Sequence, residues 1–282
     1  MYLPHTPAEI EYREWMTDCL GLAAERLGLR VSGTPVYGWH DRSVGARTEA
    51  VGGGQRWLRV VSEPAETASG LYWTGNTDAG AVAVPAKPRV LAVHEWAEGP
   101  RRLRAEAMTL LPGRACAPAN AVREPVELPD RWWDGLETAL AGIAATGTDR
   151  VNVSRAKAER RIRGRFGEQL DLPAPPWVTA HGDLHWGNLL GPEFGLLDWE
   201  SWGQGPAGLD AATLYCYSLL VPATAEQVRA RLAGLLAGPA GAFAQLYAAS
   251  RLLDRAEHGD HPELVEPLTA LARRLLGPGT AG

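Results

Sequence analysis

The hydrophobic pattern of the chain changes character along its length. Apolar side chains recur at near-helical spacing from about Glu9 to Leu29, where Gly28 supplies a stop, so an amphipathic opening helix is predicted. From Thr34 to Val61 the pattern becomes short β-prone runs divided by glycine, which predicts strand, loop, strand, tight turn and strand. The stretch 62–87 is rich in Gly, Ala, Pro and Ser and gives only a weak helical signal around residues 76–84.

A second β-prone pair follows, and the pattern then becomes helical. The runs PRVLAVHEW and RRLRAEAMTLL flank the turn-forming AEGP, which predicts an antiparallel hairpin. Pro112 and Gly113 then end the small sheet domain. Strand-like WVTA and GLLDW interrupt the helical part that comes next. Helical periodicity is found at residues 131–146, 154–166, 209–220, 225–236, 240–253 and 262–276. We therefore expect a small antiparallel sheet followed by a larger helical part.

Length and composition are those of a folded protein with one two-lobed unit. A chain of 282 residues can bury a sizeable core, and 45% hydrophobic and 22% charged residues are ordinary for such a protein. The formal net charge of -5 is spread over short stretches of mixed sign, so no basic surface is expected to attract phosphate backbones or anionic lipid. Neither nucleic acid nor a membrane is therefore an expected partner.

The cysteines and the N-terminal residues indicate a cytoplasmic protein. Cys19, Cys116 and Cys216 are odd in number, far apart and without CxxC spacing, which argues against a disulfide framework and a structural zinc site. The N-terminal segment MYLPHTPAEIEYREW lacks a basic-then-apolar signal pattern, and no apolar run approaches the roughly 18 residues needed to span a bilayer. We expect a protein of the reducing cytoplasm.

The clearest chemical signal is HGDLHWGNLL at His181–Leu190, followed by GLLDWE. Asp183 and Asn188 have the D-x-x-x-x-N spacing of a kinase catalytic loop, in which the aspartate receives the acceptor hydroxyl and the asparagine reaches a magnesium ion. Asp198 comes on the next strand-like run. Magnesium prefers hard oxygen ligands, and an acidic oxygen can align a hydroxyl with the γ-phosphate. The three residues therefore predict a phosphoryl-transfer centre.

These motifs resemble those of a known superfamily. HGDLHWGN with LLDWE is similar to the H-G-D-x-H-x-x-N and I-D-W-E motifs of the aminoglycoside phosphotransferase and choline kinase superfamily, and GPAGLDAATLY resembles its G-D-P-x-x-D-L-A segment. The resemblance implies an α+β, two-lobed protein kinase-like fold, with a small antiparallel β-sheet N-lobe and a larger, mainly helical C-lobe. It implies a nucleotide-binding lobe at residues 1–113 and a catalytic and acceptor-binding lobe at 114–282, which share one cleft.

The resemblance also implies an activity and a set of residues. The activity is an ATP- and magnesium-dependent phosphotransferase acting on a hydroxyl of a small molecule. Asp183 would be the catalytic base or the residue that orients the acceptor, and Asn188 and Asp198 would bind magnesium. Residues expected to support the site are His181, His185 and the structural aspartate Asp210.

In the sheet lobe, the resemblance places the nucleotide. The loop from Gly38 to Gly45 would cover the phosphates, and MTLLPG resembles the hinge whose backbone groups receive adenine. QRWLRVV resembles the strand on which a kinase carries its phosphate-binding lysine, and the residue at that position here is arginine. The expected ATP-binding residues are Arg59, Gly45, Thr109 and Leu111.

The arginine at this position motivates a second hypothesis. A guanidinium keeps the positive charge of a lysine but is a planar fork rather than a compact point charge. Its expected partner is a carboxylate, for which Glu63, Glu66 and Asp78 are candidates. The alternative to an enzyme is a non-catalytic kinase-like module that binds a nucleotide or a partner protein.

Three further interpretations fit the same residues less well. HGDLH could hold zinc or a dinuclear metal centre, although the other histidines form no ligand motif. Trp186 and Trp202 are core residues by default and alternatively line an acceptor pocket. An acidic run is most simply a solvated face and alternatively attracts a cationic acceptor. That run consists of Asp254, Glu257, Asp260, Glu263 and Glu266.

Overall fold

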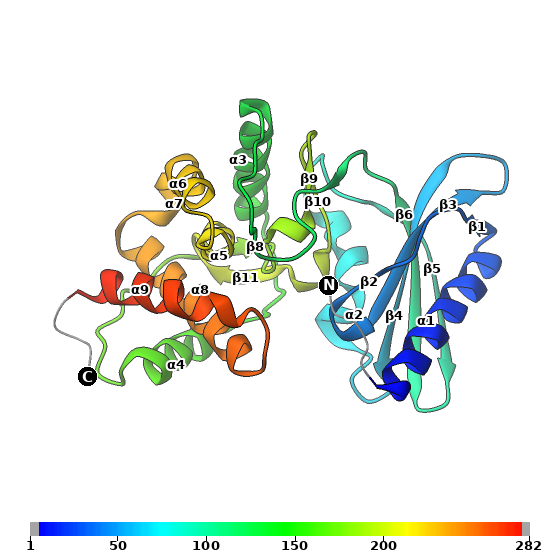
Figure 1. Ribbon diagram of the computed structural model, residues 1–282, viewed down its shortest axis with the longest axis horizontal. Coiled ribbons are helices and arrows are strands. Elements are labelled where there is room, and N and C mark those ends of the chain that lie inside the picture. Colours follow the sequence, from blue (N-terminus) through cyan, green and yellow to red (C-terminus); the bar gives the residue numbers. More distant parts are fainter. Residues whose placement is uncertain (1–5, 278–282) are drawn as a thin grey trace. The chain divides into compact units, whose positions relative to one another are not determined.

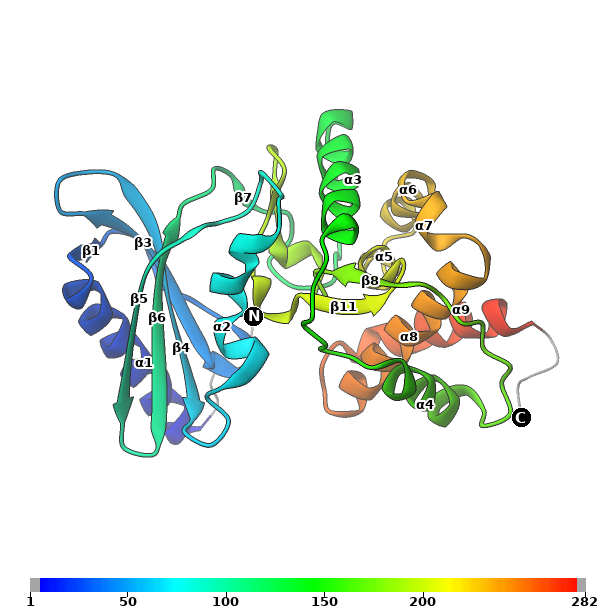
Figure 2. The same cartoon turned by 180° about the vertical axis from the view of Figure 1, so that it is seen from behind.

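The structure is a computed structural model that describes residues 6–277 (Figures 1 and 2). The described chain forms two compact units. The first runs up to Gly80 and resumes over Lys87–Pro112, while the second contains Ala81–Ala86 and the chain from Gly113 onward. The chain therefore contributes a short segment to the second unit before it returns to complete the first.

An antiparallel sheet of six strands forms the centre of the first unit. Its order is β1-β3-β4-β6-β5, and β2 pairs with β3. The hairpin predicted on either side of AEGP is confirmed as β5 and β6. Strand β1 was not predicted from the sequence. The strands are β1 (Leu29–Val31), β2 (Val36–Tyr37), β3 (Ser43–Ala50), β4 (Gln55–Pro64), β5 (Val90–Glu98) and β6 (Arg101–Thr109).

The predicted opening helix is α1 (Pro7–Arg26), which lies over one face of this sheet (Figure 1). Its first turn is fixed by a reciprocal capping box between Thr6 and Glu9, in which each side chain accepts from the backbone N–H of the other residue. The helix ends before Gly28, which has a φ of 65° that other residues rarely adopt. Local sequence signals thus set both ends of the helix.

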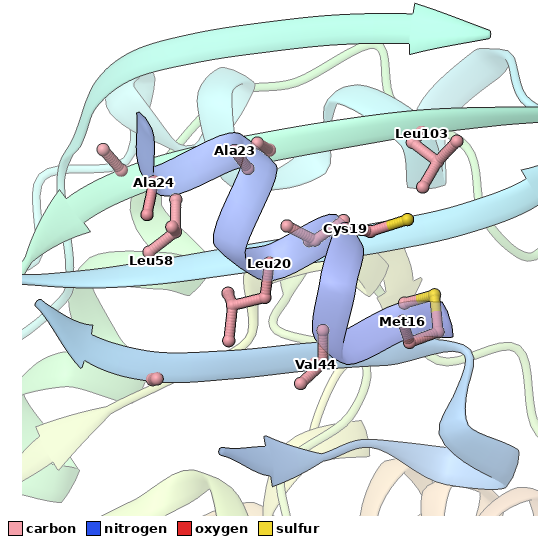
Figure 3. Close-up of a cluster of buried hydrophobic side chains, with 12 residues drawn as sticks. Met16, Cys19, Leu20, Ala23, Ala24, Val44, Leu58 and Leu103 are labelled. Carbon is pink, nitrogen blue, oxygen red and sulfur yellow. The ribbon is translucent and has the colours of Figure 1, made fainter. Parts of the chain in front are cut away.

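The core of the first unit lies between α1 and the sheet. Figure 3 shows Met16 and Leu20 of the helix beside Val44 and Leu58 of the strands. Leu20 and Leu58 are 1% and 0% exposed. This cluster consists of Met16, Cys19, Leu20, Ala23, Ala24, Val44, Ala46, Leu58, Val60, Leu103, Ala105 and Ala107.

A second helix, α2 (Gly70–Asp78), covers the other face. Its Trp73 packs against Val61 of β4, whereas Leu58 of the same strand packs against α1. The weak helical signal at residues 76–84 therefore placed this helix too late, because α2 starts at Gly70 and only a 3-10 turn continues beyond it. On β6, Arg104 and Glu106 face α2, whereas Leu103, Ala105 and Ala107 face α1.

The second unit is mainly helical. Helix α8 packs against α4, α5, α7 and α9 and is central to the helical part of this unit (Figure 2). Phe243 and Tyr247 of α8 join Ile162 of α4 and Ala272 of α9 in one core cluster. The helices are α3 (Asp130–Ala145), α4 (Arg155–Phe166), α5 (Leu209–Ser218), α6 (Pro222–Arg231), α7 (Ala233–Leu236), α8 (Gly238–Glu257) and α9 (Val265–Leu276).

Short strands frame the predicted chemical segment. Strand β8 pairs with β11, and the register Ala180↔Gly203 brings the residues after β8 next to those before β11. Strand β9 lies between β10 and β7. These strands are β7 (Arg114–Ala115), β8 (Trp177–Ala180), β9 (Leu189–Gly191), β10 (Gly195–Leu196) and β11 (Gly203–Pro206).

The fold class predicted from the sequence is confirmed. An antiparallel sheet occupies the N-terminal region and helices dominate the C-terminal part, as an α+β kinase-like fold requires. Within residues 6–277, no helix combines the length and the hydrophobicity of a membrane-spanning segment.

The packing of α1 on the sheet gives a stability prediction. Leu58→Ala removes a fully buried side chain from the centre of the cluster and should lower the free energy of unfolding by about 2–5 kcal/mol. Val51→Ala, at a residue that is 87% exposed, is the control and should change it by less than about 0.5 kcal/mol. Urea unfolding followed by circular dichroism measures both. Equal effects would contradict the assigned core.

Candidate active site

The loop after β8 is anchored by one buried carboxylate. Asp210, in the first turn of α5, is 6% exposed, and its two oxygens accept hydrogen bonds from the backbone N–H groups of His181 (2.7 Å) and Gly182 (2.9 Å). Gly182 has a φ of 83°, and a Cβ there would overlap the carbonyl oxygen of Ser201. Asp210 thus fixes the backbone of His181 and Gly182, which leads into Asp183.

His181 joins this loop to the segment that carries Asp198. Its Nε2 lies 3.0 Å from the carbonyl oxygen of Leu197, which can only accept, so Nε2 carries the proton. The ring also packs edge-on against Trp199, with 4.9 Å between ring centroids. Burial lowers the pKa of His181, although nearby Asp210 and Asp183 oppose this effect. A neutral His181 is therefore a brace between two segments.

Asp183 lies at the centre of the site with a side chain that is 27% exposed. His185 Nε2 is 3.5 Å from its Oδ2. Burial acts to raise the pKa of Asp183, but the charge and hydrogen bond of His185 and the charge of Arg251 outweigh it, so the pKa falls below the usual carboxyl range. The carboxylate is consequently ionised at neutral pH and can accept a hydrogen bond from a hydroxyl group.

Arg251 is a residue of this site that the sequence interpretation missed. It projects from α8, and its NH1 donates to the carbonyl oxygen of Gly182 at 3.2 Å. Its charge contributes to the low pKa of Asp183. No local pattern marks it, because it stands beside the acidic run and reaches the loop only through tertiary packing.

Hydrogen bonds to backbone carbonyl groups hold Asn188 next to Asp183 and next to the segment that carries Asp198. Asn188 Nδ2 donates to the carbonyl oxygen of Asp183 at 3.1 Å, so the amide oxygen is left as an acceptor. The N–H of Leu197, next to Asp198, donates to the carbonyl oxygen of Asn188 at 2.8 Å. The amide of Asn188 and the carboxylate of Asp198 therefore belong to one connected frame.

Asp198 has two features that fit a cation ligand. Its backbone is left-handed, with a φ of 57° and a ψ of 76°, a strained conformation that is concentrated at functional sites. Its Oδ1 is buried without a hydrogen-bond partner in the described part of the chain. A buried anionic oxygen without a donor is costly, and a bound cation would compensate it. Hard oxygen donors from Asp198 and Asn188 suit magnesium.

A metal cluster of another kind is not found in the described chain. Within residues 6–277, no group of three or more His, Cys, Asp or Glu side chains is arranged to hold a metal ion. Magnesium is usually bound by one or two protein groups together with phosphates and water, and so does not require such a group.

The expected nucleotide residues of the first unit lie on the sheet and just after it. Gly45 is inside β3 and pairs with Arg59 of β4, so the segment Gly38–Gly45 is not one continuous loop as expected. A 3-10 turn (Trp39–Asp41) separates β2 from β3 there. A Cβ on Gly45 would lie 2.7 Å from the indole of Trp57, so close packing of that ring requires glycine.

The expected hinge follows the end of β6. Thr109 Oγ1 accepts from the backbone N–H of Arg89 at 2.9 Å, which fixes the last residue of the strand. Leu111 lies beyond the strand, where the ladder of β4 and β6 has ended. Its backbone groups are therefore not used in the sheet.

The carboxylate beside Arg59 is one that the sequence interpretation did not consider. Arg59 NH1 lies 3.7 Å from Glu106 Oε2 of β6, and the two residues are directly opposite in the register. Of the three expected candidates, Glu63 instead pairs with Arg42 at 2.8 Å. A signal was present in RLRAEAM, where three charged residues alternate with apolar ones in a largely buried strand, a pattern that requires compensation across the sheet.

The tryptophans considered for an acceptor pocket are core residues. Trp186 is 0% exposed, stacks on Trp132 and donates from Nε1 to Ser218 at 2.9 Å. Trp202 is 3% exposed and lies beneath the guanidinium of Arg150. The default interpretation of both residues is therefore correct.

Most of the acidic run considered for a cationic acceptor is engaged in ion pairs. Asp254 binds Arg161 (2.9 Å) and Arg165 (2.6 Å) of α4. The remaining pairs are Glu257 with Arg165, Asp260 with Arg255 and Glu263 with Arg123. These carboxylates are largely neutralised, so the structure favours the interpretation as a solvated, salt-bridged face.

Comparison with known proteins identifies the class of fold. A model of the phosphotransferase enzyme family matches residues 124–253, which include the whole of the chemical segment. No curated protein sequence matches the chain. Aminoglycoside phosphotransferase APH(4)-Ia has a similar structure, with a TM-score of 0.62 and 16% identity over 93% of this chain and 99% of that one.

Two further solved structures extend the comparison. Macrolide 2'-phosphotransferase MphH from Brachybacterium faecium gives a TM-score of 0.56 at 19% identity, covering 94% of this chain and 99% of that chain. Amicoumacin kinase hAmiN gives 0.59 at 12% identity, covering 96% of each. The fold is therefore that of the small-molecule phosphotransferases, and the resemblance to the aminoglycoside phosphotransferase and choline kinase superfamily is confirmed.

The anchoring of the loop by Asp210 is testable. In Asp210→Asn one oxygen is replaced by an NH2 group that faces a backbone donor, so the free energy of unfolding should fall by about 1–3 kcal/mol. Asp134→Asn, at a side chain that is 70% exposed, is the matched control and should be nearly neutral. Urea unfolding of both variants decides, and an unchanged midpoint for Asp210→Asn would contradict the role.

Proposed function

We propose that the protein is an ATP- and magnesium-dependent phosphotransferase that transfers the γ-phosphoryl group to a hydroxyl of a small molecule. The observation that carries the proposal is the connected frame of Asp183, Asn188 and Asp198, since Asn188 binds the backbone of Asp183 and the residue before Asp198 binds the backbone of Asn188. APH(4)-Ia has been solved with ADP and hygromycin B, and hAmiN with AMP-PNP and Ca2+, which supports the same chemistry here.

Asp183 would orient the acceptor hydroxyl. Because its pKa is low, the carboxylate stays ionised and accepts the hydroxyl hydrogen bond throughout the neutral range. A weak base is adequate, since phosphoryl transfer depends mainly on alignment and on stabilisation of charge. The bonds from Asp210 and Arg251 to the loop would keep the carboxylate in place.

Asn188 and Asp198 would hold the metal ion. When bound, magnesium neutralises charge on the phosphate oxygens and holds them in line. The strained backbone and the buried oxygen of Asp198 are the features of this chain that support such a ligand. His181 and His185 would brace the loop without taking part in proton transfer.

In the first unit, Arg59 would bind the donor phosphates, and Leu111 with Thr109 would contact the base. Gly45 lies opposite Arg59 in the sheet and would contribute to the phosphate site by leaving room for the indole of Trp57. The acceptor would be a small molecule, and the protein would act in the cytoplasm without nucleic acid or membrane.

The second candidate, a non-catalytic kinase-like module, rests on arginine at position 59. The composition weakens this argument. Of 28 basic residues, only Lys87 and Lys157 are lysines, so arginine at the position where a kinase carries lysine follows the general usage of this chain. Arginine also keeps its charge when it is buried, and it can form two hydrogen bonds to one phosphate group.

Nucleotide binding is the first test. Asp198→Asn keeps the shape of the side chain but removes its charge, so the magnesium-dependent part of ATP affinity should fall by at least about tenfold. Calorimetric titration with ATP, with and without magnesium, measures this, and the chelated wild type should match the variant. Wild-type binding without any magnesium dependence would favour the non-catalytic module.

Turnover is the second test. Asp183→Asn removes the charge that orients the hydroxyl and should lower the rate of ADP formation by about 10²–10⁴-fold, while ATP affinity is retained. Hygromycin B, a macrolide and amicoumacin are the first acceptors to test, because the structurally similar proteins bind these compounds or are named after them. Asp171→Asn at an exposed position is the control. Full turnover by Asp183→Asn would refute the assignment.

A further inference from the structure

A row of three residues crosses the sheet of the first unit at Arg59. Gly45 of β3 pairs with Arg59 of β4, and Arg59 pairs with Glu106 of β6. The side chains of Arg59 and Glu106 are 12% and 1% exposed, and the nearest nitrogen and oxygen are 3.7 Å apart. Two opposite charges are thus almost completely removed from water on the face that α2 covers. Such a pair is stable only if further groups hold it.

Glu106 is held from two directions. Arg104, two positions earlier on β6, donates from Nε to Glu106 Oε1 at 2.9 Å, and Asn76 of α2 donates from Nδ2 to Oε2 at 2.8 Å. Arg104 is itself fixed, because it also binds Thr77 of α2 at 2.6 Å and Glu95 of β5. The carboxylate of Glu106 is therefore placed by the sheet and by the helix together.

The arrangement differs from the usual kinase pairing, in which a lysine of the sheet pairs with a glutamate of the adjacent helix. Here α2 contains one acidic residue, Asp78, whose carboxylate accepts the hydroxyl of Thr74 at 2.6 Å. The helix directs an uncharged amide, that of Asn76, toward the carboxylate of the sheet. A carboxylate of the sheet, that of Glu106, therefore lies directly beside Arg59.

We infer that Glu106 is the positioning residue for Arg59 and takes the place of the helix glutamate. The inference rests on the proposed function, since the task of Arg59 is to bind the donor phosphates. Because Arg104 supplies the hydrogen-bonded positive partner of Glu106, Arg59 is aligned by charge at 3.7 Å without a hydrogen bond to this carboxylate. Its positive charge is then directed to the donor phosphates.

The test is a cycle of four proteins: wild type, Arg59→Met, Glu106→Gln and the double variant. ATP affinity with magnesium is measured for each by calorimetry. Glu106→Gln should weaken ATP binding by about tenfold in the presence of Arg59 and by less than about twofold in the Arg59→Met background. The matched control is Glu63→Gln, which removes a carboxylate of the same sheet that pairs with Arg42 and should leave ATP affinity unchanged.

A rescue variant separates positioning from general damage to the fold. Adding Asn76→Asp to Glu106→Gln returns a carboxylate to the site from α2, next to the position that Glu106 oxygen occupied. Most of the lost ATP affinity should return. An equal effect of Glu106→Gln with and without Arg59, or no effect at all, overturns the inference.

The failure of the proposed function gives a different result. In that case the wild type shows no magnesium-dependent ATP binding, and the same four proteins are compared by urea unfolding. A coupling of about threefold or more between the two substitutions in the unfolding equilibrium constant supports the pairing of Arg59 with Glu106. Independent effects on unfolding overturn it.

Discussion

The candidate site depends on a single buried carboxylate that serves two backbone amides. The oxygens of Asp210 take the N–H groups of His181 and Gly182, which would otherwise be buried donors without partners. This fixes the direction in which the chain leaves β8 toward Asp183. His181 can reach Leu197, and Asn188 can close on Asp183, only when the loop starts in this direction. The site is thus built on main-chain geometry first and side chains second.

In the first unit, buried polar groups are held in place by ion pairs between charged side chains. A polar face lies between the sheet and α2, where Arg59 of β4 and Glu95 of β5 form ion pairs with Glu106 and Arg104 of β6. Such networks are favourable only when every member is satisfied. The ring of Trp57 lies across Gly45 beside this network. The face is consequently specific in shape, and few of its members could change alone.

The sequence was most informative where the signal is local. Asp183, Asn188 and Asp198 lie within a short stretch whose spacing points to one chemistry, and the structure brings them together. Glu106 could not be assigned, because its contact with Arg59 depends on the register between β4 and β6, which lie far apart in the sequence. Helix α2 was misplaced because it is short and glycine-rich and is held mainly by Trp73. Arg251 depends in the same way on how α8 packs.

The segment Ala81–Ala86 is synthesised between two parts of the first unit but belongs to the second unit. The carbonyl oxygen of Ala86 accepts from the N–H of Leu196, which the ribosome adds about 110 residues later. At roughly 5–20 residues per second, about 5–20 s separate the synthesis of Ala86 from that of its hydrogen-bond partner. A fragment that ends at Gly113 would contain the whole first sheet but would lack Leu196, whose N–H binds the carbonyl oxygen of Ala86. In the nascent chain, Ala81–Ala86 therefore lacks its hydrogen-bond partner until β10 has been synthesised.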